Sequence, residues 1–278
     1  MKTLLVATDF SEAASDAANY AADMALAIGA ELLLLNAYNA ASDYAEVTVG
    51  LDTERIQKDT EASLDKLKSF LRKRTGNRVC ISTSAVYGKF FDVLKDTCEN
   101  IKPYAVIMGS QGTTGLDHLL FGSHTVNTAK HLRWPLITVP KGSKFSAVKK
   151  IGLACDFSEV VKSIPISEIK LMVKDFNASL HILNTGKQEA FDPEIVFQSG
   201  LLEEMLLPMK VDYHFITNTD TDAGIIDFAE KNNIDLLITL PKRHSLLNKI
   251  AHASHTKQFI LHSHVPVMVL HHYSLTSR

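Results

Sequence analysis

Three glycines and a serine in the middle of the chain have the spacing of a phosphate-binding loop. Gly109 and Gly112 come directly after the apolar run 104–108, and nine residues separate Gly112 from Gly122 and Ser123. Glycines at a strand end let the backbone turn sharply and approach a ligand, because no Cβ intervenes. A glycine and a hydroxyl at a helix start offer N–H groups and the positive end of the helix dipole. The pattern indicates a site for phosphate.

A carboxylate, Asp9, follows the first apolar run, 2–8, as Gly109 follows a later one. Carboxyl ends of parallel strands form one edge of an α/β sheet, and ligands bind at that edge. We therefore expect Asp9 and Gly109 to lie near one another. The alternative for Asp9 is a turn carboxylate, since the sequence Asp9-Phe10-Ser11 also suits the turn before a helix.

The elements that would position these residues alternate between strand and helix. The apolar runs predict strands covered on both faces, and amphipathic or alanine-rich stretches predict helices between them. Ser11 is expected to cap the first helix and Gly29 to follow its end. The predicted strands are 2–8, 31–37, 79–87, 104–108 and 135–139, and the predicted helices are 13–28, 51–74, 90–101 and 125–132.

The same pattern restarts at Lys150. The segment 7–12 recurs at 154–159 as Ala-x-Asp-Phe-Ser-Glu, Asn36 recurs as Asn184, and Pro135 recurs as Pro266. The falling offset means that the second copy is shorter in its middle. We predict an α/β protein with two tandem domains, 1–142 and 150–278. Each is Rossmann-like or flavodoxin-like, a five-stranded, mostly parallel sheet with helices on both faces.

The signature Gly-x2-Gly-x9-Gly-Ser resembles that of the ATP-binding branch of the universal stress protein family. The Asp9 turn and the closing segment 134–140 are also similar to that family, so the resemblance covers about 1–142 and restarts more weakly at 150. It implies ATP, or AMP or ADP, as the ligand, with Mg²⁺ as an optional companion. Asp9 would accept hydrogen bonds from the ribose, and the Ala37 backbone would read the base. The implied nucleotide-binding residues are Ala7, Thr8, Asp9, Ala37, Met108, Gly109, Gly112, Gly122, Ser123, His124 and Thr125.

The second half lacks the glycines. Alignment on Pro266 places Leu240, Arg243 and Ala253 where the three glycines stand, although 254–256 repeat Ser-His-Thr. Side chains at these positions would fill the space that a phosphate needs. We therefore expect the second half to be degenerate for ATP and to serve architecture, sensing or a different ligand.

Metal binding and catalysis have little support. His252 and His255 have helical i, i+3 spacing, but no cysteine lies nearby and no acidic residue follows Asp235, so no metal site is predicted. A Gly-x-Ser-x-Gly elbow and a Walker lysine are absent, and Asp117 is expected to face solvent. No catalytic residue is predicted. The expected function is a nucleotide-dependent module of the stress response; a slow ATPase or phosphotransfer enzyme and a nucleotide-free interaction scaffold are the alternatives.

Composition restricts the partners and the compartment. Lysine and arginine (29) are scattered and outnumbered by acidic residues (31), which argues against a nucleic-acid surface. The apolar runs are too short to span a bilayer, and three cysteines without CxxC spacing favour a reducing cytoplasm. The apolar strands 136–139 and 267–270 need cover, so we predict that they pair as an intramolecular pseudo-dimer. A homodimer of whole chains is a further option.

Overall fold

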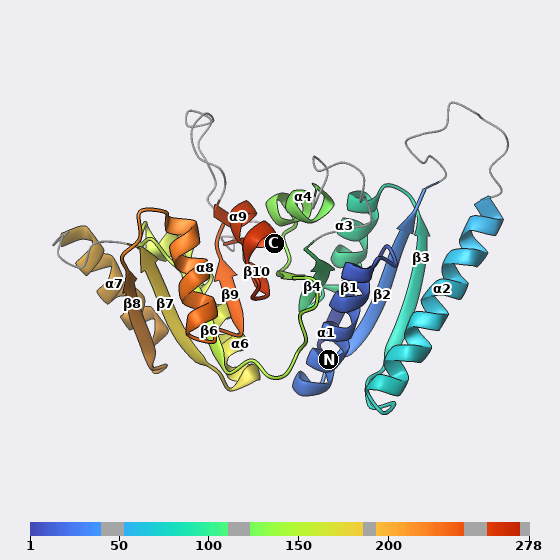
Figure 1. Ribbon diagram of the computed structural model, residues 1–278, viewed down its shortest axis with the longest axis horizontal. Helices are drawn as coiled ribbons and strands as arrows, with labels where there is room; N and C mark the ends of the chain where they lie inside the picture. The colour runs from blue at the N-terminus through green and yellow to red at the C-terminus, as the bar shows by residue number, and fades with distance from the viewer. Residues whose placement is uncertain (40–52, 111–122, 186–192, 242–254, 273–278) are drawn as a thin grey trace.

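The computed structural model describes residues 1–39, 53–110, 123–185, 193–241 and 255–272. The first half contains β1 (Thr3–Ala7), α1 (Glu12–Ile28), β2 (Glu31–Tyr38), α2 (Thr53–Arg74), β3 (Ile81–Tyr87), α3 (Phe90–Ile101), β4 (Ala105–Gly109), α4 (Ser123–His131) and β5 (Leu136–Val139). The second half contains β6 (Lys150–Ala154), α5 (Val160–Ser163), α6 (Ile166–Phe176), β7 (Ser179–Thr185), α7 (Pro193–Leu206), β8 (Val211–Ile216), α8 (Thr221–Lys231), β9 (Leu236–Thr239), α9 (His255–His262) and β10 (Val267–Val269) (Figure 1). The alternation of strands and helices confirms the predicted α/β class.

The strands form a single sheet of ten in the order β3-β2-β1-β4-β5-β10-β9-β6-β7-β8. Neighbouring strands are parallel within each half. The halves meet where β5 and β10 pair antiparallel, with Ile137 opposite Met268. This pairing confirms the predicted contact between the two edge strands. Each half thus covers the other's apolar edge.

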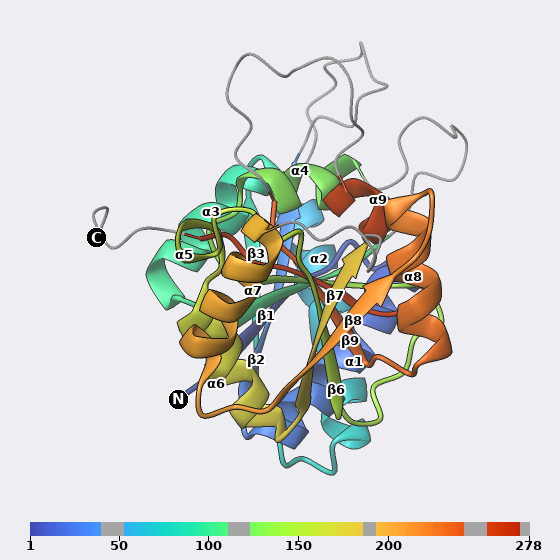
Figure 2. The ribbon, with the colours of Figure 1, turned by 90° about the vertical axis from the view of Figure 1, so that its left-hand side faces the viewer.

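Helices cover both faces of this sheet. The core on one face contains side chains from α1, α2, α6 and α7, and it runs through both halves. The other face is covered by α3 and α4 in the first half and by α8 and α9 in the second. Figure 2, seen from the second half, shows α6 and α7 on one side of β7 and β8, with α8 on the other.

The halves are joined by side chains as well as by the sheet. Lys2 Nζ lies 2.6 Å from Asp175 Oδ1, whose side chain is 11% exposed. Tyr20 of α1 meets the ring of Phe145 edge-on at 5.1 Å. On the opposite face α4 packs against α9. The connecting segment is therefore packed against the protein, and the two halves form one body.

Local signals explain both ends of α1. Ser11 Oγ accepts a hydrogen bond from Ala14 N, and Gly29 is left-handed with φ 63°, as a C-cap requires. The shorter middle of the second half is seen in α7, which has 14 residues against 22 in α2. None of the helices in the described part of the chain is both long and apolar enough to cross a membrane.

Candidate functional site

The carboxyl ends of β1 and β4 lie side by side in the first half. The chain leaves β1 toward β2 on one side and returns to β4 on the other, so the strand order reverses between β1 and β4. Open α/β sheets bind ligands at such a switch point. The structure brings Ala7, Thr8, Met108 and Gly109 together here, with Asp9 next to them at the edge.

The turn after β1 holds Asp9 at the surface. Thr8 N continues the sheet to Leu35 O at 2.9 Å, and the buried Asn36 amide donates to Thr8 O at 2.7 Å. Asp9 Oδ1 accepts a hydrogen bond from Ser11 N at 3.0 Å. The carboxylate is exposed beside the end of β4. It therefore serves as a turn residue, as the structural alternative predicted, and it also presents charge at the switch point.

Gly109 is required by packing between β4 and α1. A Cβ at Gly109 would lie 2.8 Å from the carbonyl carbon and oxygen of Ala13. The close approach that this glycine permits is thus to the first turn of α1, whereas the sequence pattern indicated an approach to a ligand. Thr125 of α4 fixes the same corner, because its hydroxyl donates to Gly109 O at 3.0 Å and is buried.

The remaining predicted residues divide into two groups. Ala37, in β2, packs against the core on the α3 side, and His124 is exposed with its ring 5.2 Å from that of Phe90. Gly112 and Gly122 lie outside the described residues, and Ser123 is described only as the first residue of α4. The described residues therefore include those expected around the nucleoside and, of those expected around the phosphates, Ser123, His124 and Thr125 at the start of α4.

Sequence reasoning missed two members of this site. Asn36 was noticed only as part of the repeat, but its amide ties β2 to the Thr8 carbonyl. Phe10 has φ 63°, a left-handed conformation that is unusual for a bulky residue, and its side chain is 37% exposed. Both residues could have been found from the repeat, because Asn36 recurs as Asn184 and Phe10 recurs as Phe157.

The second half builds the same turn. Asp156 Oδ1 accepts from Ser158 N at 3.1 Å, and the buried Asn184 amide donates to Cys155 O at 2.8 Å. Phe157 is left-handed with φ 56°. The backbone and the carboxylate position are therefore conserved between the halves of this chain, whereas the surroundings differ.

Aromatic side chains fill the second half beside this turn. Phe157 is only 2% exposed, and its ring lies 6.3 Å from that of Tyr213 and 6.2 Å from that of Phe215. Burial raises the pKa of Tyr213 to about 12, with the charges of Glu203 and Cys155 adding to the effect. The strand register puts Thr83 and Ala85 of β3 at the matching positions of the first half. Small side chains there leave Phe10 partly exposed.

The helix after the turn differs as well. In the first half α1 begins at Glu12, but in the second half α5 is short, Pro165 follows it and α6 begins at Ile166. Proline cannot donate a backbone hydrogen bond within a helix, which explains the interruption. The register of β4 and β9 on their neighbours places Leu240 at the position of Gly109. Leu240 packs against the core. The second half thus has a large side chain where the first half has Gly109, and among its described residues no long helix begins close to this position as α1 does in the first half.

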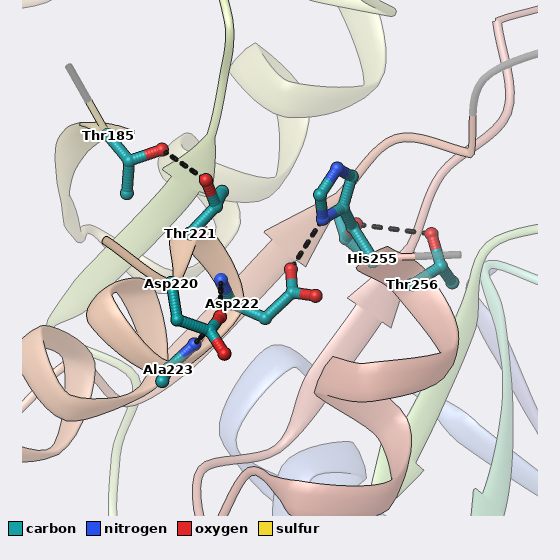
Figure 3. Close-up of polar contacts among 8 residues, drawn as sticks. Thr185, Asp220, Thr221, Asp222, Ala223, His255 and Thr256 are labelled. Carbon is teal, nitrogen blue, oxygen red and sulfur yellow. Dashed lines mark hydrogen bonds and ion pairs between the residues drawn. The ribbon is translucent and has the colours of Figure 1, made fainter. Parts of the chain in front are cut away.

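A separate polar network lies at this edge of the second half (Figure 3). His255 Nδ1 is 2.6 Å from Asp222 Oδ1, linking α9 to α8, and the Thr256 hydroxyl lies 3.3 Å from that of Thr239. Thr221 accepts from the hydroxyl of Thr185. His255, weighed above as a metal ligand, is thus paired with a carboxylate, while His252 and Arg243 lie outside the described residues.

The described residues at the first-half edge offer groups that can bind a ligand. Among the described residues no three His, Cys, Asp or Glu side chains converge as a metal site. The first-half edge offers an exposed carboxylate, buried small residues and backbone groups at the start of α4. A carboxylate accepts hydrogen bonds from hydroxyl groups, and a helix N-terminus favours an anion. This combination suits a ligand with hydroxyls at one end and negative charge at the other.

Comparison with known proteins gives a consistent result. The model of the universal stress protein family matches residues 1–140 and again 147–271. Universal stress protein Slr1230 of Synechocystis sp. is 26% identical over 294 residues, covering 96% of this chain and 99% of that protein. The crystal structure of a universal stress protein from Archaeoglobus fulgidus superposes with a TM-score of 0.70 at 17% identity, covering 97% of this chain and 98% of that one. A universal stress protein in complex with cAMP matches 51% of this chain and 98% of its own, with a TM-score of 0.39 and 21% identity.

Proposed function

Because this chain belongs to the universal stress protein family, we propose that its first half binds ATP or another adenine nucleotide at the carboxyl ends of β1 and β4. The chain acts in this proposal as a nucleotide-dependent regulatory module of the stress response. Asp9 accepts hydrogen bonds from the ribose hydroxyls, and the backbone of Ala37 contacts the edge of the base. The phosphates bind at the start of α4. The described residues fit the nucleoside end of such a ligand, since Asp9 is exposed among small neighbours.

The observation that carries this proposal is the difference between two otherwise matching turns. Asp9 and Asp156 accept the same backbone hydrogen bond, at 3.0 and 3.1 Å. Beside Asp156, however, Phe157 is buried against β8, whereas Phe10 beside Asp9 is 37% exposed. Among the described residues, side chains therefore fill the space beside the Asp156 turn and leave the Asp9 turn more exposed. We assign the nucleotide to the edge that carries Asp9.

Substitution of the two aspartates tests the assignment in the full chain. Asp9→Ala is expected to weaken ATP binding by about 1–3 kcal/mol, the usual loss for hydrogen bonds to a charged group, which is roughly 5- to 150-fold in Kd. Asp156→Ala removes the matching turn bond in the second half and should leave the affinity unchanged. Isothermal titration calorimetry measures both. Equal effects of the two substitutions would refute the assignment of roles to the halves.

A third variant separates charge from turn geometry. Asp9→Asn keeps a side-chain oxygen that can accept from Ser11 N, so the turn should persist. Its ATP affinity is expected to fall between those of the unchanged chain and Asp9→Ala, because a neutral acceptor bonds ribose more weakly than a carboxylate. Phosphate release measured in the same samples separates a binding module from the alternative enzyme, since turnover above background would favour the ATPase.

A further inference from the structure

Two histidines lie against each other at the outer edge of the second half. His181 of β7 and His214 of β8 stack with ring centroids 5.3 Å apart, and His181 Nδ1 is 3.0 Å from His214 Nε2. Among the described strands, β8 is the last of the sheet and pairs with β7 alone. The side-chain contact thus adds to the backbone ladder that holds the edge strand.

The neighbouring hydrogen bonds favour one direction for this contact. The Ser179 hydroxyl donates to Lys149 O at 3.3 Å and its oxygen lies 2.9 Å from His181 Nε2, so we assign the His181 proton to Nε2. A neutral imidazole carries one proton, which leaves His181 Nδ1 as an acceptor. His214 Nε2–H is then the donor across the strands. One added proton can be shared by the pair, because His214 can carry its own proton on Nδ1 and accept from His181 Nδ1–H through Nε2. A second proton makes both rings cationic, sets two N–H groups against each other at 3.0 Å and breaks this bond.

Charged groups on the adjoining strands do little to stabilise a protonated His181. Asp212 Oδ2 lies 3.6 Å from His181 Nδ1, but this carboxylate side chain is 69% exposed and its attraction is weakened by solvent. Lys150 of β6 adds positive charge, and its Nζ donates to Asn232 O. Desolvation lowers the pKa of His181, His214 and Lys150 lower it further, and Asp212 opposes them.

The helix packed on this pair supplies an apolar contact. The Phe228 ring of α8 lies 4.8 Å from that of His214. The charged side chains of α8 with ion partners are directed to those partners: Asp222 to His255, Asp227 to Lys231 and Glu230 to His264. None of these three pairs includes His181 or His214. The His214 ring thus contacts both the His181 ring and the Phe228 ring, and the His181 side chain is 12% exposed.

We propose that the His181–His214 pair is a proton-sensitive clamp that holds the edge strand β8 at neutral pH and releases it in acid. The first half provides an internal comparison. The strand registers place Leu33 of β2 and Ser84 of β3 at the matching positions, and neither titrates in this range. The matching positions of the first half therefore carry no such pair, and the clamp does not depend on nucleotide binding.

The sign of the effect follows from proton linkage. His181 has a lowered pKa in the closed strand pair, whereas an opened strand exposes it and restores an ordinary value of about 6.5. The open form then binds the proton more readily. The contribution of the clamp is complete above that ordinary value and is lost as the pH falls below it.

Amide hydrogen exchange of the full chain tests the clamp. After correction for intrinsic exchange rates, protection of the β8 amides is expected to fall by about tenfold between about pH 7.5 and about pH 5.5, the size of effect that one hydrogen bond gives. Amides of β3, in the same sample, should change much less. A parallel response of β8 and β3 would overturn the proposal.

Variants that carry the first-half residues make the test specific. His181→Leu with His214→Ser should remove the pH dependence of β8 protection, whereas His262→Gln, on the exposed side of α9, should retain it. Persistence of the dependence in the double variant would contradict the clamp. If the double variant fails to fold, NMR titration of the His181 ring in the unchanged chain decides. A His181 that titrates at the ordinary value would equally overturn it.

Discussion

Phe157→Ala is expected to destabilise the chain by about 3–5 kcal/mol, the usual cost of truncating a buried phenylalanine. The ring is 2% exposed and lies between Tyr213 and Phe215, so its removal would leave a cavity against β8. Alanine at this position would also have to adopt the left-handed φ of 56°. The packing of the phenylalanine ring, which now offsets the energy of this backbone conformation, would be gone. Urea denaturation of the full chain measures the change in the free energy of unfolding.

Phe10→Ala is the matched control for this prediction. It removes the same residue type from the same turn with a similar φ of 63°, but its side chain is already 37% exposed. The expected cost is below about 1 kcal/mol, as for most surface substitutions. Similar losses for the two variants would show that the second half is not closed by Phe157 in the way the structure indicates.

Gly109→Val should destabilise the first half by about 3 kcal/mol. This value lies at the upper end of overpacking costs, because the obstacle is the main chain of Ala13 at 2.8 Å and main chain cannot rotate away. The first turn of α1 would have to move away from β4. Thermal and urea unfolding both report this loss. The N-cap of the displaced turn, Ser11, donates its backbone N–H to Asp9 Oδ1, so nucleotide binding should weaken as well.

Gly200→Ala supplies the control for a glycine that has no such neighbour. Gly200 lies within α7, and a Cβ there would meet no atom within 4 Å. Alanine in a helix is favoured over glycine, so a gain of about 0.5–1 kcal/mol is expected. A Gly109→Val variant as stable as the unchanged chain would contradict the close packing of α1 on β4.

Most of the fold could be predicted because its signals are local. The apolar runs, the Ser11 cap and the Gly29 end gave element positions within a few residues of those observed. The recurrence of Ala-x-Asp-Phe-Ser-Glu gave the second half, and the apolar strands after Pro135 and Pro266 gave their pairing. The interruption of the helix at Pro165 was missed, although a proline inside a helical pattern was a usable signal.

The site was less predictable, because the burial of its side chains depends on contacts between residues that are far apart in the sequence. Phe10 and Phe157 occur in identical Asp-Phe-Ser turns, and only the residues of β3 or β8 beside them decide which ring is buried. Gly109 was expected to make room for a ligand, but its neighbour is Ala13, which only the packing of α1 reveals. The contact of His181 with His214 likewise depends on the register of β7 and β8, which sequence does not display.

The arrangement suggests separate tasks for the two halves. The second half supplies β10, which covers the β5 edge that the first half would otherwise expose. It retains the Asp156 turn but fills the adjacent space with Phe157 and Leu240. We therefore propose that the second half is a partner built into the same chain, with its own response to acid, and that the nucleotide binds to the first half.

The number of ATP molecules bound per full-length chain tests this account most directly. Equilibrium dialysis with labelled ATP, or native mass spectrometry, counts bound nucleotide without separating the halves. We predict one nucleotide per chain, lost in parallel with the affinity decrease of Asp9→Ala and retained in Asp156→Ala. Two equivalent nucleotides per chain, or none at saturating ATP, would contradict the account.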